Sequence, residues 1–215
     1  MVAVAIYGWE SENERDSCIE HVRNQTLADI EILAQGEDEG SISFRNRAIA
    51  EAKGPYITFL HAKARYVFPT VLQLMTLTAQ AEDAEVVAGQ TSYSINKTCR
   101  YEDGLPRSAG WVPLERCITL NVGLSGFLFD LGFLKRKRLQ YIDVDDRIEA
   151  AFLQKALIFA GGCYSLGRTV VSSAHTPFKE KALDFEETVC LYCELLGCAV
   201  SASATEYHDM LVQRL

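Results

Sequence analysis

The sequence predicts an α/β fold built around a doubly wound, mostly parallel sheet flanked by helices. Short apolar segments of strand length alternate with segments of helical periodicity along the first half of the chain. Val2–Tyr7 is the clearest apolar run, and a strand apolar on both faces is what a parallel sheet covered by helices requires. Ligands of such sheets bind beyond the carboxyl ends of the strands. We therefore expect the loops after Tyr7, Leu33 and Leu60 to line one site.

The first half of the chain contains the segments that support this fold class. Ser11–Gln25 has helical periodicity, and the apolar run Ile30–Leu33 follows it. After a polar loop, Phe44–Lys53 predicts a second helix, which Gly54-Pro55 ends. Tyr56–Leu60 is then a further buried strand. This alternation of strand and helix is typical of a parallel sheet.

The second half begins with a helix predicted at Pro69–Ala81 and a strand at Glu85–Gln90. The stretch Thr91–Pro113, which contains Trp111, is polar and predicts an irregular connection. Connections of this length often form binding surfaces. The remaining predicted elements are an amphipathic helix at Ile148–Ala160, ended by Gly161-Gly162, and a mostly helical stretch at Phe185–Leu215.

Size and composition indicate one globular domain, residues 1–215. Hydrophobic residues make up 48% and charged residues 23% of the chain, which is the balance of a protein with a packed core. The first residues carry no basic leader, and no run approaches the roughly 20 apolar residues of a membrane span. We expect a cytoplasmic protein. A net charge of -8 argues against a nucleic-acid partner.

Two segments raise the question of other partners. Lys135–Arg138 is a dense basic cluster, which forms either a solvated helix end or a peripheral contact with anionic lipid. The apolar segment Val189–Leu196 either packs on the core or contributes to an oligomer.

Several strings, in order along the chain, resemble those of family 2 glycosyltransferases, the inverting enzymes of the GT-A fold. Cys18–Ile32 resembles the family's first helix, its N-Q-T turn and its second strand. Arg45–Leu60 resembles the segment that leads into the family's metal motif. Leu124–Phe129 and Phe152–Leu157 are similar to the strand and the helix on either side of the acceptor-side acid. The matches extend from Val2 to about Gly162.

The resemblance implies a nucleotide-sugar donor and a glycan or other hydroxyl acceptor. It divides the domain into a nucleotide-binding half (1–66), an acceptor-side half (67–165) and a C-terminal helical extension (166–215). The family has a further helix and strand before the segment that Arg45 begins, and too few residues remain here for both. We therefore expect a GT-A-like sheet reduced by one helix–strand unit.

The nucleoside site implied by the resemblance combines aromatic and acidic side chains. An aromatic face can stack on a base, and a carboxylate can accept hydrogen bonds from a base or a ribose. The alternative interpretation is that the tyrosine packs in the core and the acids form a solvated loop. The residues expected at this site are Tyr7, Trp9, Glu10, Glu37, Asp38 and Arg45.

The diphosphate site departs from the family. Where the family has a metal-binding D-x-D motif, this chain has His61-Ala62-Lys63. An ammonium group cannot ligate a cation, so divalent-metal binding in the family's manner is doubtful. Two hypotheses follow. His61 and Lys63 place positive charge beside the phosphates without metal, or the site has decayed and the chain is a non-catalytic GT-A-like domain.

The acceptor side needs a carboxylate as general base. Alignment with Phe152 places Glu149 at the position of the family's acid, at the start of a helix. The helix dipole also favours a carboxylate there, which is the structural alternative. Asp145 and Asp146 are rival candidates.

Overall fold

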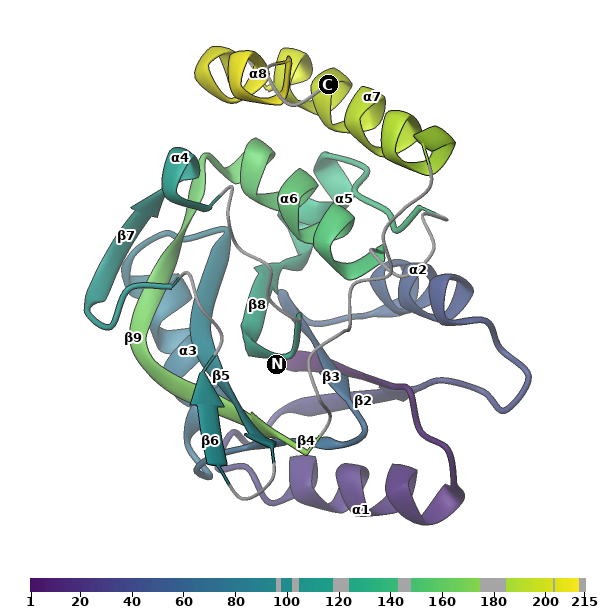
Figure 1. Ribbon diagram of the computed structural model, residues 1–215. Coiled ribbons are helices and arrows are strands. Elements are labelled where there is room, and N and C mark those ends of the chain that lie inside the picture. The colour runs from purple at the N-terminus through teal and green to yellow at the C-terminus, as the bar shows by residue number, and fades with distance from the viewer. Residues whose placement is uncertain are drawn as a thin grey trace.

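Nine strands form one mixed sheet in the computed structural model, which describes residues 1–95, 98–101, 105–117, 124–142, 148–174, 185–202 and 204–212 (Figure 1). The principal strand order is β2-β1-β3-β8-β5-β9-β4, with β6 beside β5 and β7 beside β9. The strands are β1 (Val2–Tyr7), β2 (Ile30–Ala34), β3 (Tyr56–His61), β4 (Ala64–Tyr66), β5 (Val86–Ile95), β6 (Thr98–Tyr101), β7 (Ala109–Pro113), β8 (Phe127–Asp130) and β9 (Gly162–Ser173).

Most strands of the principal order run in one direction. β1 is parallel to β2 and β3, and β5 is parallel to β9. β8 is antiparallel to both β3 and β5, and β4 is antiparallel to β9. Strands β1, β2, β3, β5 and β9 therefore share one direction, whereas β8 and β4 run the opposite way. The carboxyl ends of β1, β2 and β3 therefore lie at one edge of the sheet, next to the amino end of β8.

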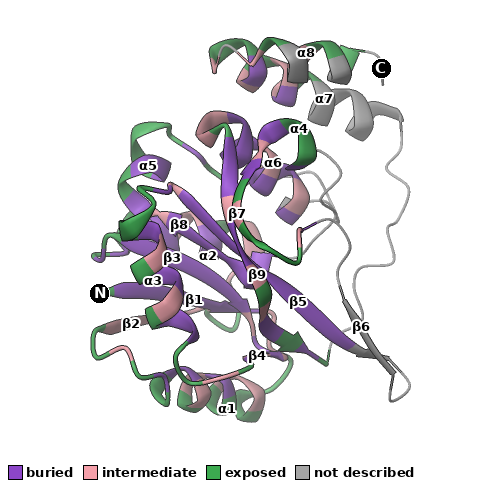
Figure 2. Ribbon diagram, turned by 90° about the vertical axis from the view of Figure 1, so that its left-hand side faces the viewer, coloured by how far each residue is buried: buried purple, intermediate pink, exposed green. Residues whose placement is uncertain are grey.

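Helices cover both faces of the sheet, and the side chains of β1 show why. Ala3, Ala5 and Tyr7 belong to the core cluster beneath α2, α5 and α6, whereas Val4 and Ile6 belong to the cluster beneath α1 and α3. β1 is therefore buried on both sides, as Figure 2 shows. The helical segments are α1 (Glu12–Arg23), α2 (Ser41–Glu51), α3 (Val71–Ala81), α4 (Leu114–Cys117), the 3-10 turn η1 (Leu124–Gly126), α5 (Leu131–Arg136), α6 (Ile148–Ala160), α7 (Phe185–Ser201) and α8 (Thr205–Val212).

The predicted doubly wound α/β sheet is confirmed, and one segment of the prediction is wrong. Thr91–Pro113 is not an irregular connection, because β5 continues to Ile95 and the segment also contains β6 and β7. Strand β9 was also not predicted from the sequence. These strands lack a continuous apolar run or a clear alternation in sequence, and their partners in the sheet stabilise them: β5 pairs with β6 and β9, and β7 pairs with β9.

The expected loss of one helix–strand unit is visible at the β2 side of the sheet. The chain passes from β2 through a short loop directly into α2 and then β3. β2 is therefore the first strand of the sheet order.

The C-terminal helices pack on α6 through a buried lysine and apolar contacts. The Lys155 ammonium donates to the Gln140 carbonyl and to Glu194 Oε1, both at 2.7 Å. Leu195 and Ala199 of α7 are buried in the core cluster. The part of the apolar segment whose side chains are described therefore packs on the core.

The basic cluster Lys135–Arg138 lies at the end of α5, and its described contacts are intramolecular. Lys135 donates to the carbonyls of Ala50 and Ala52, and Arg136 pairs with Glu85 at 3.2 Å. The Lys137 ammonium lies 5.3 Å from the Phe159 ring centre. Within the described residues, no helix has the length and apolarity needed to cross a bilayer. Lipid contact by this cluster stays a prediction.

The turn from α6 into β9 gives a test of the fold. Gly161 and Gly162 have φ values of +71° and +137°, which disfavour side chains, but only Gly162 is also crowded: an added Cβ would overlap the Val112 carbonyl oxygen. We expect Gly162→Ala to lower the free energy of unfolding by about 3 kcal/mol or more. Gly161→Ala is the matched control, because an added Cβ there meets open space, and it should cost about 1 kcal/mol. Urea denaturation measures the free energy of unfolding of both variants. Equal losses would contradict the close contact between β7 and β9 at Gly162.

Candidate functional site

The candidate site lies where the carboxyl ends of β1 and β3 meet the turn before β8. Tyr7 and His61 are register partners at the ends of their strands. The Ala62 N–H donates to the Tyr7 carbonyl at 2.8 Å, and the His61 N–H donates to Ser125 Oγ at 3.2 Å. Two of the three segments predicted from sequence to line a ligand site, those after Tyr7 and Leu60, therefore meet here.

A buried cluster of charged and phenolic groups forms the floor of the site. Glu149, at the start of α6, is 7% exposed, and Arg45 of α2 is 4% exposed. Glu149 Oε1 accepts from Arg45 Nη2 at 2.6 Å and from the Tyr7 hydroxyl at 2.7 Å. Glu149 Oε2 accepts from the Leu124 N–H at 3.3 Å. Both oxygens of this carboxylate are thus engaged.

Aromatic rings enclose the guanidinium of this cluster. The Arg45 guanidinium carbon lies 4.0 Å from the Tyr7 ring centre and 5.3 Å from that of Tyr141. Burial, followed by the negative charge of Glu149, raises the pKa of Tyr7, so its phenol stays protonated and donates a hydrogen bond to the carboxylate. Arg45 Nε and the Tyr141 hydroxyl are buried without a hydrogen-bond partner. These two donors are available to a polar group that enters the cluster.

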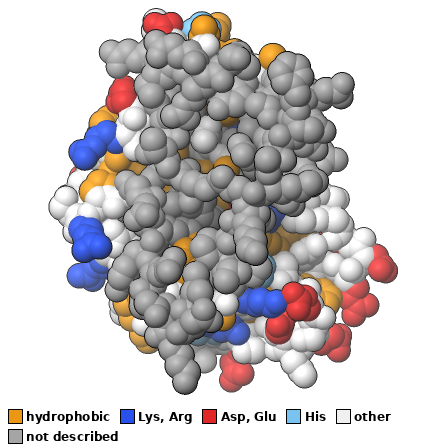
Figure 3. Space-filling model, in the orientation of Figure 1, with side chains coloured by type: hydrophobic (Ala, Val, Ile, Leu, Met, Phe, Trp, Pro, Cys, Tyr) orange, Lys and Arg blue, Asp and Glu red, His pale blue; other side chains and the backbone are white. Residues whose placement is uncertain are grey.

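An ion pair closes the rim of the site. Lys63, in the turn after β3, extends its ammonium to Glu10 Oε1 at 2.6 Å, which links the loop after β1 to the β3–β4 turn. The hydrogen bond that Lys63 donates to the Glu10 carboxylate raises the pKa of Lys63, so the ammonium is charged at neutral pH. Figure 3 shows acidic side chains gathered beside this region, over the start of α1 and the β2–α2 loop.

The His61 imidazole packs between the two strand ends. Its Nδ1 accepts from the Lys63 N–H at 3.1 Å, so this nitrogen carries no proton in the structure. The ring stands edge-on to Tyr7 at 5.4 Å and lies so close to Gly8 that a Cβ at that position would overlap it. Gly8 has a φ of +70°, so both the backbone and the space beside it require glycine.

The β2–α2 loop carries the two predicted acids at its tip. Glu37 and Asp38 are exposed. The loop is held by Gln35, whose amide accepts from the Gly8 N–H at 3.1 Å and donates to the Glu39 carbonyl at 2.6 Å. The Gln35 carbonyl accepts from the Trp9 indole N–H at 3.2 Å. Gln35 thus orients the loop after β1, which sequence reasoning missed.

The structure brings together most of the predicted residues, at different depths. Tyr7, Arg45 and Glu149 meet in the buried floor, and Glu10 with Lys63 forms the rim. Three further residues of the site were not predicted from sequence: Gln35, Ser125 and Tyr141. Only Gln35, a polar residue just after a predicted strand, could have been recognised as a site candidate. The rivals Asp145 and Asp146 lie outside the described residues.

His61 and Lys63, where the resemblance led us to expect a D-x-D motif, do not fit the metal of such a motif. The two side chains there are an imidazole whose Nδ1 already accepts a hydrogen bond and an ammonium paired with Glu10. A divalent cation that bridges phosphates prefers oxygen ligands, and an ammonium repels it. The chemistry of these groups suits a direct contact with an anion.

This sheet order, with the carboxyl ends of β1, β2 and β3 facing a site closed by β8 and α6, defines a GT-A-like fold, the fold of nucleotide-diphospho-sugar transferases. Solved structures that resemble the chain include those of TarS from S. aureus. Residues 1–349 of TarS with UDP match at a TM-score of 0.75 and 13% identity, over 92% of this chain and 64% of that one. The same region with UDP-GlcNAc matches at 0.73 and 11%, over 94% and 71%.

A longer TarS structure matches at a TM-score of 0.76 and 12% identity, over 98% of this chain and 42% of that one. This chain thus spans less than two thirds of the first of these structures. No protein-family model matches the chain, and no curated protein matches it. At these identities the similarity shows the fold.

The buried ion pair gives a second testable prediction. Glu149→Gln keeps the shape of the side chain but leaves the Arg45 charge uncompensated, so we expect a loss of about 3 kcal/mol in the free energy of unfolding. Glu51→Gln, which breaks the more exposed pair with Arg47, is the control and should cost at most about 0.5 kcal/mol. Removing both charges with Arg45→Met and Glu149→Leu should recover part of the loss. Chemical denaturation measures the free energy of unfolding of each variant. Equal losses for Glu149→Gln and Glu51→Gln would refute the role of the buried pair.

Proposed function

We propose that this chain binds a nucleoside-diphosphate sugar at the carboxyl edge of β1, β2 and β3 and transfers the sugar to a hydroxyl acceptor, as an inverting, family 2-like glycosyltransferase. One observation carries the proposal: aromatic, acidic and cationic side chains from three loops converge at this edge of a GT-A-like sheet. The similarity to TarS structures holding UDP and UDP-GlcNAc supports the choice of donor.

Each part of the donor has a partner in this proposal. Trp9, half-buried beside Gly8, stacks on the base. Glu37 and Asp38, exposed on the neighbouring loop, accept hydrogen bonds from the ribose or the base. Tyr7 and Arg45 lie beneath them and fix the floor of the site.

The diphosphate is neutralised by cationic side chains rather than by a D-x-D metal. Lys63 is charged and sits at the rim, where its partner Glu10 is exposed to solvent. On binding, the diphosphate replaces Glu10 as the partner of Lys63, and His61 lies next to it at the end of β3. A charge-assisted contact of this kind stabilises the leaving group as the glycosidic bond breaks.

Glu149 is the proposed general base for the acceptor hydroxyl, with Asp145 and Asp146 as rivals. Glu149 Oε1 already accepts two hydrogen bonds and Oε2 accepts one, so the acceptor's proton would go to Oε2. The engagement of both oxygens in the buried cluster favours a second candidate function, a non-catalytic domain that binds the nucleotide sugar or a glycan without transfer. The two candidates share the donor site and differ only in turnover.

Calorimetric titration with UDP, UDP-GlcNAc and GDP-mannose tests the donor site. We expect binding of at least one nucleotide that persists in EDTA and gains little from manganese. Lys63→Ala should weaken it about tenfold or more, because a charge-assisted hydrogen bond is lost. Lys53→Ala, which removes the same charge from an exposed residue after α2, is the control and should leave binding unchanged. No heat with any nucleotide, or strict dependence on manganese, would contradict this site.

Release of UDP from the bound UDP-sugar separates the two candidate functions. The transferase predicts UDP release in EDTA, slow with water as acceptor and faster with a suitable saccharide. The non-catalytic domain predicts tight binding of intact UDP-sugar with no release over hours. Coupled detection of free UDP, with Lys63→Ala as the binding-deficient control, decides between them.

A further inference from the structure

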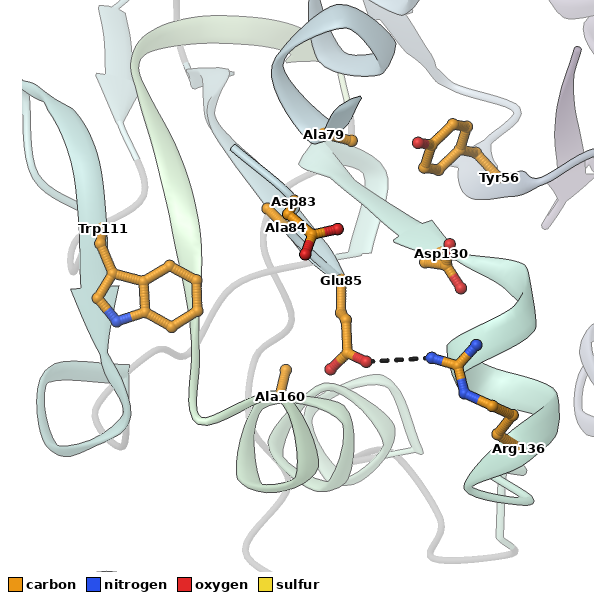
Figure 4. A pocket seen from close by; sticks show the side chains of 9 residues that line it. All are labelled: Tyr56, Ala79, Asp83, Ala84, Glu85, Trp111, Asp130, Arg136 and Ala160. Carbon is orange, nitrogen blue, oxygen red and sulfur yellow. Dashed lines mark hydrogen bonds and ion pairs between the residues drawn. The ribbon is translucent and has the colours of Figure 1, made fainter. Parts of the chain in front are cut away.

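A second concave site lies at the opposite edge of the sheet from the candidate donor site. A pocket with a volume of about 440 Å³ opens near the amino ends of β3 and β5 and the carboxyl end of β8 (Figure 4). Small-molecule sites in proteins typically have volumes of about 300–1,000 Å³. The side chains that line it and carry the argument are Tyr56, Asp83, Glu85, Trp111, Asp130 and Arg136.

One wall of this pocket is an aromatic ring that remains open to solvent. Trp111 of β7 is 53% exposed, and Figure 4 shows its indole turned toward the pocket. Gly162 of β9 lies against this ring, since a Cβ there would come within 3.2 Å of its Cζ2 atom, so β9 supports the indole on one side. A half-exposed, supported indole offers a flat apolar face to a ligand.

The facing wall is polar, and one of its carboxylates is paired. Glu85 pairs with Arg136 at 3.2 Å, as the dashed line in Figure 4 marks, and Asp130 accepts from the Phe133 N–H as the N-cap of α5. Burial raises the pKa of Tyr56, so its hydroxyl stays protonated and can donate. This wall therefore presents hydrogen-bond donors and acceptors, with the negative charges of Asp83 and Asp130 left over from the ion pair.

We propose that this pocket binds a neutral saccharide. A pyranose has apolar C–H faces that stack on an indole and hydroxyls at its edge that pair with carboxylates, guanidinium and phenol, and this pocket sets these two kinds of surface opposite each other. An organic cation would suit Asp83 and Asp130, but Arg136 repels it, Glu85 is already paired with Arg136, and Asp130 already accepts from the Phe133 N–H.

The saccharide pocket is separate from the donor site, and the inference does not depend on sugar transfer. Tyr56 and Tyr7 stand at opposite ends of the paired strands β3 and β1. A saccharide here does not present its hydroxyl to the donor site. The pocket instead holds another part of a glycan, for a transferase or a non-catalytic domain alike.

Tryptophan fluorescence tests the proposal on the full chain. The chain has two tryptophans, and Trp9→Phe leaves Trp111 as the only reporter. Titration with maltotriose, chitotriose and methyl β-glucoside should shift or quench this emission saturably for at least one of them, while spermidine should have no effect. In calorimetry on the otherwise unaltered chain, Trp111→Ala should weaken that saccharide about tenfold.

Two further variants make the outcome specific. Asp83→Asn keeps a residue that tolerates the φ of +49° at this position but removes a carboxylate, and should weaken the saccharide several-fold. Leu77→Ala removes a side chain of similar exposure, 55%, that is not part of the pocket lining, and should change nothing. Absence of saccharide binding, binding unaffected by Trp111→Ala, or preference for spermidine would each overturn the proposal. UDP titrations of Trp111→Ala should match those of the unaltered chain, which keeps this test independent of the donor site.

Discussion

The ion pair between Arg45 and Glu149 is the contact on which the architecture of the candidate site depends. The two residues are 104 positions apart, one in the nucleotide-binding half predicted from sequence and one in the acceptor-side half. Their charges are almost fully buried, so each requires the other and the hydrogen bonds that surround the pair. The pair therefore couples the two halves, and the positions of Tyr7 and Leu124 follow from it.

The same contact stabilises the fold but limits the ability of Glu149 to act as a base. A carboxylate that accepts from a guanidinium, a phenol and a backbone N–H is well held, but it has little freedom to receive a proton from a substrate. The rim shows the same pattern, because Lys63 is occupied by Glu10 until an anion competes for it. Under the proposed function, a ligand would therefore bind by exchanging partners with Glu10 and with the donors to Glu149.

The sequence predicted the sheet where burial is visible in the residues themselves. Val2–Tyr7 is apolar on both faces, and the predicted strand has the observed bounds. Prediction was wrong for Thr91–Pro113, because strands with polar sequences are defined by the neighbours they pair with, and those lie far along the chain. For the candidate site, strand ends and the family resemblance pointed to Tyr7 and Lys63, which the structure places at the carboxyl ends of β1 and β3. The partners of Arg45 and the role of Gln35 depend on side-chain directions, which cannot be inferred from the hydrophobic periodicity of the sequence.

The short connection from β2 to α2 leaves β2 at one end of the strand order. As the first strand in the order, β2 pairs on one side with β1, and in the part of the chain that is described its other side has no strand partner. An unpaired backbone of this kind can template strand addition from another chain, and short length and charge are the usual protection. β2 has both, since it ends at Ala34 and carries Glu31, whose carboxylate accepts from the Lys53 N–H. The lost helix–strand unit has thus placed a new solubility constraint on five residues, independent of any constraint from the ligand.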